Sequence, residues 1–311
     1  MIYTCTLNPS IDYVMTVSEF EAGGLNRAHQ TFYYPGGKGI NVSRVMSRLG
    51  VDTAALGFIG GFTGEFVKNY LSKEHVSHQF VDTGQTTRVN VKLKSSDETE
   101  INGPGPNLTE NHQQKLLEQV RSLTEEDTLV LAGSVPSSLP TDFYNTIADI
   151  CYKNGTKFVA DTSGDALKKL IGHPLFMLKP NHHELGDLFS TTIDSVDKAA
   201  HFAEKLLDEG VKHVVISMGG AGAVYVGENK RLVANVPKGT VKNSVGAGDS
   251  LVSGFIAALH KGEPVEEAFR YGVAAGSATA FNDDLCKRED VESLLSEIVI
   301  SSINNEEGIN Q

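Results

Sequence analysis

Residues 241–259, VKNSVGAGDSLVSGFIAAL, contain three small residues, 246–248, that lead into Asp249 and then into a small-residue, apolar segment. This pattern predicts a glycine-rich turn at the N-terminus of a helix, where free N–H groups and partial positive charge attract anions. Asp249 then has two interpretations. It caps the helix, which is worth about 1 kcal/mol, or it stands beside a bound phosphate as a base, weakened because the helix terminus favours the ionised carboxylate.

Short strands and longer helices alternate along the rest of the chain. Near-continuous apolar runs such as DTLVLAGS (127–134) and HVVISMGG (213–220) are typical of strands that are covered on both faces. Segments such as VDKAAHFAEKLLDEG (196–210) have the spacing of amphipathic helices. We therefore expect a single α/β domain over residues 1–311, with a mostly parallel central sheet and crossover helices.

Two regions, about 10–36 and about 86–104, depart from this alternation. Their polar residues occupy alternate positions, which predicts hairpin-type strands in a small, half-exposed sheet. Ligands of α/β folds bind beyond the carboxyl ends of the strands, so a small sheet projecting there would suit a lid. The tail, about 300–311, has little to bury, and we expect it to be disordered.

The composition narrows the possible partners. With a formal net charge of −12, the chain is a poor candidate for binding nucleic acid or anionic membranes. It contains no apolar run of ~18 residues and no visible secretory signal, and its three separated cysteines predict free thiols, so we expect a cytoplasmic protein. If the ligand is a phosphate ester, a local basic cluster must overcome the overall negative charge.

Candidate binding residues lie near the predicted strand ends. PGGKGINVSR (35–44) places Lys38 in a glycine turn at a helix start, which is either an anion or polyol site or a turn with a solvated lysine. Arg88 can bind two phosphate oxygens with its fork, although a solvated strand face is the alternative, and we prefer it for Lys92 and Lys94. Asp12 either accepts sugar hydroxyls or is a turn residue.

Two further segments concern cofactors. In LKPNHHEL (178–185), Asn181 and Glu184 face one side, which allows contact through water to hydrated Mg²⁺ but is also the pattern of a helix capping box. VVISMGGAGAVYV (214–226) is a strand, a glycine turn and another strand. It lacks the dinucleotide fingerprint at the start of a helix, which argues against a dehydrogenase.

Taken together, these segments resemble the ribokinase-like carbohydrate kinases of the phosphofructokinase-B branch. GGKGIN (36–41) and VGAGDSLVSGF (245–255) are similar to the two signatures of that family, and LKPNHHE is similar to its N-x-x-E magnesium motif. The resemblance extends to about residue 298. It implies an ATP-dependent sugar-phosphate kinase with a ribokinase-like three-layer α/β sandwich, a small β-sheet lid, and a homodimer formed through that lid.

The resemblance also implies residue roles. Asp249 is the implied general base, in an anion hole formed with Gly246, Ala247 and Gly248. The implied sugar-phosphate ligands are Asp12, Gly37, Lys38, Asn41, Arg88, Ser134 and Arg27. The residues implied to bind ATP and Mg²⁺ are Asn181, Glu184, Ser217, Gly219, Gly222, Ala275 and Ser277, with Glu184 reaching Mg²⁺ through water.

Within the family, TLNPSID (6–12), TRVNVKL (87–93) and ETEINGPGP (98–106) are most similar to members that phosphorylate fructose 1-phosphate to fructose 1,6-bisphosphate. Members that act on tagatose 6-phosphate are the close second, and fructose 6-phosphate is a further alternative substrate. A non-catalytic sugar-phosphate-binding protein is the alternative of another class, and the intact segment 246–249 argues against it.

Overall fold

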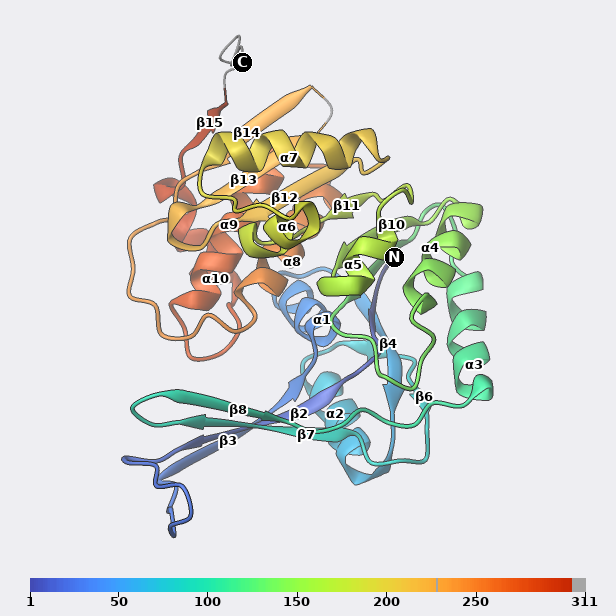
Figure 1. The fold of residues 1–311 in the computed structure, drawn as a ribbon, viewed down its shortest axis with the longest axis vertical. Coiled ribbons are helices and arrows are strands. Elements are labelled where there is room, and N and C mark those ends of the chain that lie inside the picture. Colours follow the sequence, from blue (N-terminus) through green and yellow to red (C-terminus); the bar gives the residue numbers. More distant parts are fainter. Residues whose placement is uncertain (228, 304–311) are drawn as a thin grey trace.

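The computed structural model describes residues 1–227 and 229–303 (Figure 1), and its centre is an 11-stranded sheet. The strand order is β15-β14-β13-β12-β11-β10-β9-β1-β4-β5, with β6 also pairing β4. The strands from β12 to β5 run parallel, and β13, β14 and β15 are antiparallel. Their bounds are β1 Ile2–Thr6, β4 Thr53–Ile59, β5 Ser77–His78, β6 Val81–Asp82, β9 Thr128–Ala132, β10 Lys157–Asp161, β11 Met177–Leu178, β12 His213–Ser217, β13 Ala223–Gly227, β14 Lys230–Ala234 and β15 Ile300–Ser302.

Helices cover both faces of this sheet (Figure 1). One face packs against α3 (Glu110–Arg121), α4 (Phe143–Asn154), α5 (Gly164–Leu170), α6 (His182–Phe189) and α7 (Val196–Asp208). The other packs against α1 (Lys38–Arg48), α8 (Ala247–His260), α9 (Val265–Ala280) and α10 (Arg288–Leu294), while α2 (Gly61–Lys73) packs beside α1. In β9, Leu129 and Leu131 enter the first core and Val130 the second, because successive strand residues point to opposite faces. The predicted α/β architecture is confirmed.

A separate four-stranded sheet, called here the small sheet, has the order β3-β2-β7-β8 and extends away from the central sheet (Figure 1). Its strands, β2 (Ser10–Thr16), β3 (Gln30–Gly36), β7 (Arg88–Lys94) and β8 (Glu98–Asn102), all lie within the two regions of alternating polarity. Strand β2 pairs antiparallel with β3 but parallel with β7. Segments far apart in sequence are thus joined in one sheet.

The C-terminal segment differs from its prediction at one point. Residues Ile300–Ser302 form edge strand β15, which pairs antiparallel with β14, whereas the sequence indicated disorder from about residue 300. The strand was missed because backbone pairing at a sheet edge needs no hydrophobic pattern. The remainder of that prediction, from residue 304, lies outside the described residues. No described helix is long and apolar enough to cross a membrane.

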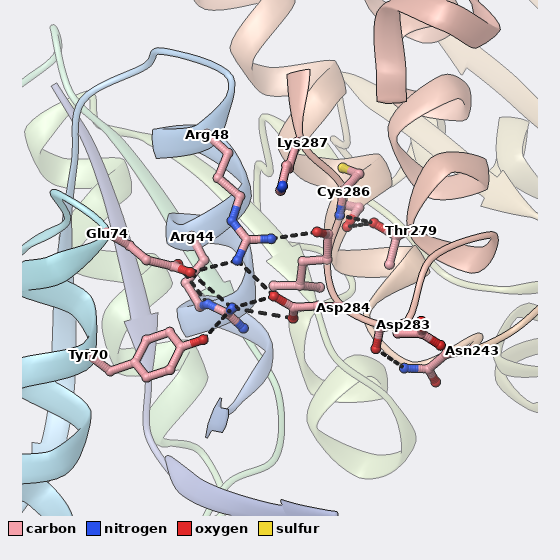
Figure 2. A network of polar contacts seen from close by, with 12 residues as sticks. Arg44, Arg48, Tyr70, Glu74, Asn243, Thr279, Asp283, Asp284, Cys286 and Lys287 are labelled. Atoms are coloured by element: carbon pink, nitrogen blue, oxygen red, sulfur yellow. Dashed lines mark hydrogen bonds and ion pairs between the residues drawn. The ribbon is translucent and has the colours of Figure 1, made fainter. Parts of the chain in front are cut away.

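A buried ion network ties α1 to two other segments of the chain (Figure 2). The Arg44 side chain, only 1% exposed, donates from Nε to Glu74 at 2.8 Å and from Nη2 to Asp284 at 2.9 Å. Arg48 donates to the same two carboxylates. Two positive and two negative groups therefore hold α1 against the end of α2 and the segment after α9, and the charges balance.

Candidate active site

A cavity of about 990 Å³ opens at the carboxyl ends of the parallel strands. Residues that end or follow five strands line it: Thr6 at the end of β1 and Asn8 after it, Ser134 after β9, Thr162 after β10, Lys179 after β11 and Ser217 at the end of β12. The small sheet contributes Asp12, Arg88 and Asn90, and the start of α8 contributes 246–249. Ligands of open α/β sheets bind at this edge.

The glycine-rich turn forms the N-terminus of α8, as the sequence predicted. Gly246 is the N-cap residue, with φ of 80°, and a Cβ there would lie 2.6 Å from Leu285 Cδ2, so a larger residue would be strained and would displace the Leu285 side chain. Ala247 N–H donates to Ser244 O at 3.3 Å. Within the described chain, the N–H groups of Gly248 and Asp249 donate to no acceptor, and they remain available for an anion.

Asp249 is the third residue of α8, and its side chain makes no capping bond, so the cap interpretation is wrong. The carboxylate is 4% exposed and accepts a 2.8 Å hydrogen bond from Asn41 Nδ2. Burial, followed by the nearby charge of Asp161, raises the pKa of Asp249 to about 6. This corrects the expectation of a weak base, because burial and the charge of Asp161 outweigh the lowering of the pKa by Lys38, Asn41 and Lys179.

A buried charge cluster next to Asp249 was not predicted from the sequence. Asp161, fully buried, accepts a 3.2 Å hydrogen bond from Lys38 Nζ and lies 3.4 Å from Lys179 Nζ. Burial raises the pKa of Asp161, but the two ammonium groups lower it by more. The net effect is a pKa below the usual value, so this carboxylate stays ionised. Asp161 Oδ2 has no protein partner within the described residues. Asp161 and Lys179 both come at the ends of apolar runs that form parallel strands. This position in the sequence is the signal that could have identified them as site residues.

Lys179 also lies against the glycine turn. A Cβ at Gly248 would be 3.2 Å from Lys179 Nζ, so the absence of a side chain at residue 248 lets the ammonium group approach the backbone. Although burial lowers the pKa of Lys38, the charges of Asp161, Asp249 and Glu184 raise it above its usual value. Lys179 thus lies beside the site of the implied anion, and Lys38 carries a positive charge near Asp249.

The implied sugar-phosphate ligands line the cavity, with one exception. Asp12, Gly37, Lys38, Asn41, Arg88 and Ser134 all line it. Arg88 Nη2 donates to Asn8 O at 3.0 Å, and Arg88 Nε is buried without a partner among the described residues. Arg27 lies in the exposed connection between β2 and β3, so the structure does not bring it to the cavity.

The cavity lining also includes Ser217, Gly219, Gly222 and Ser277. Ser217 ends β12, which three strands separate from β1 in the central sheet. Ala275 does not line the cavity. This residue is fully buried on the side of α9 that packs against α8, where a Cβ at Gly254 would lie 2.9 Å from the Ala275 Cβ. Gly276, Ala280 and Phe281, which were not predicted, occupy the cavity side instead.

Asn181 and Glu184 line the cavity and also form a capping box at the start of α6. Asn181 Oδ1 accepts from Glu184 N, and Glu184 Oε2 accepts from Asn181 N, both at 2.8 Å. Among the described residues, no group of three or more His, Cys, Asp or Glu side chains could hold a metal ion alone. The second Glu184 oxygen belongs to a side chain that lines the cavity, which fits contact through water to a cation that keeps its waters, as Mg²⁺ does.

A buried carboxylate at a helix N-terminus, with two lysines nearby, is suited to transferring a phosphoryl group to a hydroxyl. The model of the pfkB family carbohydrate kinases matches residues 5–286, and the chain belongs to that family. It is 51% identical to 1-phosphofructokinase of Bacillus subtilis over 97% of this chain and 100% of the relative. It is 35% identical to D-tagatose-1-phosphate kinase of Bacillus licheniformis, with coverage of 97% and 100%.

Solved structures of the family share this architecture. Phosphofructokinase-2 of Escherichia coli, in complex with substrates and products, superposes with a TM-score of 0.90 at 31% identity. The match covers 95% of this chain and 98% of that one. The fold is thus the ribokinase-like α/β fold that the sequence motifs implied, with a large central sheet and a smaller separate sheet.

Proposed function

We propose that this protein transfers the γ-phosphoryl group of ATP to the free primary hydroxyl of fructose 1-phosphate, giving fructose 1,6-bisphosphate and ADP. The observation that carries the proposal is the position of Asp249. Its carboxylate is buried beside the unpaired N–H groups at the start of α8 and lies in the same cavity as Asp12 and Arg88. The 51% identity to a 1-phosphofructokinase supports the choice of sugar.

In the proposed reaction, Asp249 accepts the proton of the attacking hydroxyl. The hydroxyl oxygen forms a bond to the γ-phosphorus while the bond from that phosphorus to the bridging oxygen of ADP breaks. The N–H groups of Gly248 and Asp249 and the ammonium of Lys179 face the developing charge on the transferred group. Mg²⁺, when bound, would neutralise ATP oxygens, with Glu184 oriented toward its waters.

The phosphate already on the sugar requires positive charge in an acidic protein. Arg88 supplies a guanidinium with one unpaired buried nitrogen, Lys38 supplies an ammonium, and Ser134 supplies a hydroxyl. These groups form the local basic cluster that a chain of net charge −12 needs. Arg27 is left out of the proposed set because it lies away from the cavity.

We also propose that the small sheet acts as a lid and forms a homodimer contact. Tyr33, Val89 and Ile101, which are 50%, 38% and 61% exposed, share one face of that sheet, on strands β3, β7 and β8. Large apolar side chains gathered on an exposed face are typical of an interaction surface. We place the enzyme in the cytoplasm, where its three buried free thiols would stay reduced.

The test is a comparison of kcat/KM for fructose 1-phosphate, tagatose 1-phosphate, tagatose 6-phosphate and fructose 6-phosphate, with ADP formation as the readout. Fructose 1-phosphate is expected to give the highest value. The relative that acts on tagatose 1-phosphate makes that sugar the second candidate. ADP formation with none of the four would favour the non-catalytic binding protein, and a higher value for another sugar would overturn the choice of substrate.

A further inference from the structure

Two polar side chains of the small sheet hold one oxygen of Asp12. Asp12 Oδ1 accepts a 2.8 Å hydrogen bond from Ser10 Oγ and a 3.0 Å hydrogen bond from Asn90 Nδ2. Asn90 Nδ2 also donates to Ser10 Oγ at 3.0 Å. Within residues 1–227 and 229–303, no protein group donates to Asp12 Oδ2, which belongs to a side chain lining the cavity. One carboxylate oxygen is therefore satisfied by protein and the other is open to a ligand.

Asn90 can hold Asp12 in only one amide orientation. Its Oδ1 accepts from the backbone N–H of Gly103 at 3.2 Å, while its Nδ2 faces the Asp12 carboxylate. A flipped amide would place an oxygen against a carboxylate and a nitrogen against an N–H donor. Asn90 is 6% exposed, and leaving any of these groups unpaired would be costly. The contacts therefore fix the Asn90 side chain before any ligand arrives.

The backbone on the other side of Asp12 is shaped to fit this arrangement. Gly36 ends β3 and pairs with Ser10 across the small sheet. A Cβ at Gly36 would overlap both Ser10 Oγ and Asp12 Oδ1. The Asp12 carboxylate is thus held between a glycine on β3 and an asparagine on β7, and it has little room to rotate.

We propose that Asn90 is a positioning residue that makes Asp12 a rigid acceptor for ring hydroxyls, and that it thereby sets the preference between ketose phosphates that differ in hydroxyl configuration. The proposal rests on the proposed kinase function. Fructose and tagatose differ only at C4, so an acceptor with a fixed direction can bond one epimer and miss the other. An acceptor free to rotate would adjust to both. A site built to bond a hydroxyl discriminates most strongly when its polar groups cannot adjust.

The test compares N90D with N102D. N90D is nearly isosteric and keeps an acceptor for Gly103 N–H, but it replaces the donor to Asp12 with a negative charge. Asn102 lies directly opposite Asn90 on β8, is exposed and does not line the cavity, so N102D makes the same chemical change beside it. We measure kcat/KM for fructose 1-phosphate and tagatose 1-phosphate, together with KM for ATP, for both variants and the wild type.

N90D is expected to lower kcat/KM for fructose 1-phosphate by about 10- to 100-fold, mostly through KM for the sugar. It should also lower the fructose-to-tagatose ratio by about fivefold or more, with KM for ATP unchanged. N102D should keep the wild-type ratio. In a D12N background, N90D should have no further effect on the fructose-to-tagatose ratio. A merely structural role of Asn90 would not give this dependence on Asp12.

A folded N90D variant with the wild-type ratio would overturn the proposal. If N90D does not fold, S10A removes the other donor to Asp12 Oδ1 with little change in volume and should shift the ratio in the same direction by a smaller factor. An unchanged ratio in S10A would then overturn it. If the wild type phosphorylates neither sugar, the proposed function itself fails, and that result is distinct from failure of the positioning role.

Discussion

The side-chain amide of Asn41, on α1, donates a 2.8 Å hydrogen bond to Oδ2 of Asp249, on α8, across 208 positions of sequence. Each residue belongs to one of the two glycine-containing motifs that stood out in the sequence. The bond lies within a cavity at the strand ends and leaves one carboxylate oxygen of Asp249 for a substrate hydroxyl. Two helix N-termini, each preceded by glycine, therefore meet around a single carboxylate.

Replacing Asp249 with asparagine should lower kcat by at least two to three orders of magnitude, with a much smaller change in KM for the sugar. The substitution keeps the size of the side chain and removes only its ability to accept a proton. D197N makes the same change at an exposed position in the first turn of α7 and should keep wild-type turnover. A D249N enzyme that retains a tenth of wild-type kcat would show that Asp249 is not the base.

The pH dependence of kcat/KM should depend on the charged groups near Asp249. The base form is needed, so kcat/KM should rise with pH through about 6, the pKa to which burial and Asp161 raise this carboxyl. D161N removes a negative charge beside Asp249, which lowers its pKa, and the acidic limb should move to lower pH. The substrate phosphate also ionises near pH 6, but it is the same in both assays. D165N, at an exposed site on α5, should leave the limb unchanged, and an unshifted limb in D161N would contradict the coupling.

Arg88→Ala should raise KM for the sugar phosphate by about 10- to 100-fold, because a charge-assisted contact to phosphate is lost. KM for ATP should stay close to its wild-type value, since Arg88 is on the small sheet and none of the implied ATP-binding residues is. Lys92→Ala is the matched control, as this lysine lies on the same strand and pairs with Glu100. Equal KM values for the sugar in R88A and wild type would exclude Arg88 as a phosphate ligand.

Glu74→Gln should destabilise the protein by about 3 kcal/mol or more in urea unfolding, because it leaves the buried Arg44 guanidinium without one of its two carboxylates (Figure 2). Glu65→Gln breaks an exposed ion pair between Glu65 and Lys68 on the same helix, α2. It should lower the free energy of unfolding by less than about 1 kcal/mol. The prediction fails if the two variants have the same free energy of unfolding. Activity measured below the unfolding transition should fall far less than in D249N.

Ile101→Glu should shift the protein from dimer to monomer in light scattering coupled to gel filtration. The substitution puts a charge on the apolar face formed with Tyr33 and Val89, where a partner sheet would have to desolvate it. Tyr152→Glu, at a 68% exposed aromatic on α4, should leave the oligomer unchanged. A wild type that is already monomeric, or an I101E protein that remains a dimer, would refute the proposed contact.

Much of the fold could be predicted because it depends on local patterns. Apolar runs such as 127–134 indicated doubly covered strands, and alternating polarity in 88–94 indicated a half-exposed sheet. Strand β15 could not be predicted in this way, because Ile300–Ser302 is held by backbone pairing to β14. Local pattern also could not show which side of a helix faces the ligand cavity. Ser277 lines the cavity, while Ala275, two residues earlier, packs against α8.

The sequence by itself determined the secondary structure around the site and the chemical groups available there, because glycine turns, helix starts and strand ends are encoded by neighbouring residues. Only the tertiary structure decided how those groups behave. Asp249 has its raised pKa because folding buries it near Asp161, and Asp161 stays ionised because Lys38, at the start of α1, and Lys179, after β11, converge on it. Desolvation and Coulomb interactions depend on distance in space, which spacing along the chain does not specify.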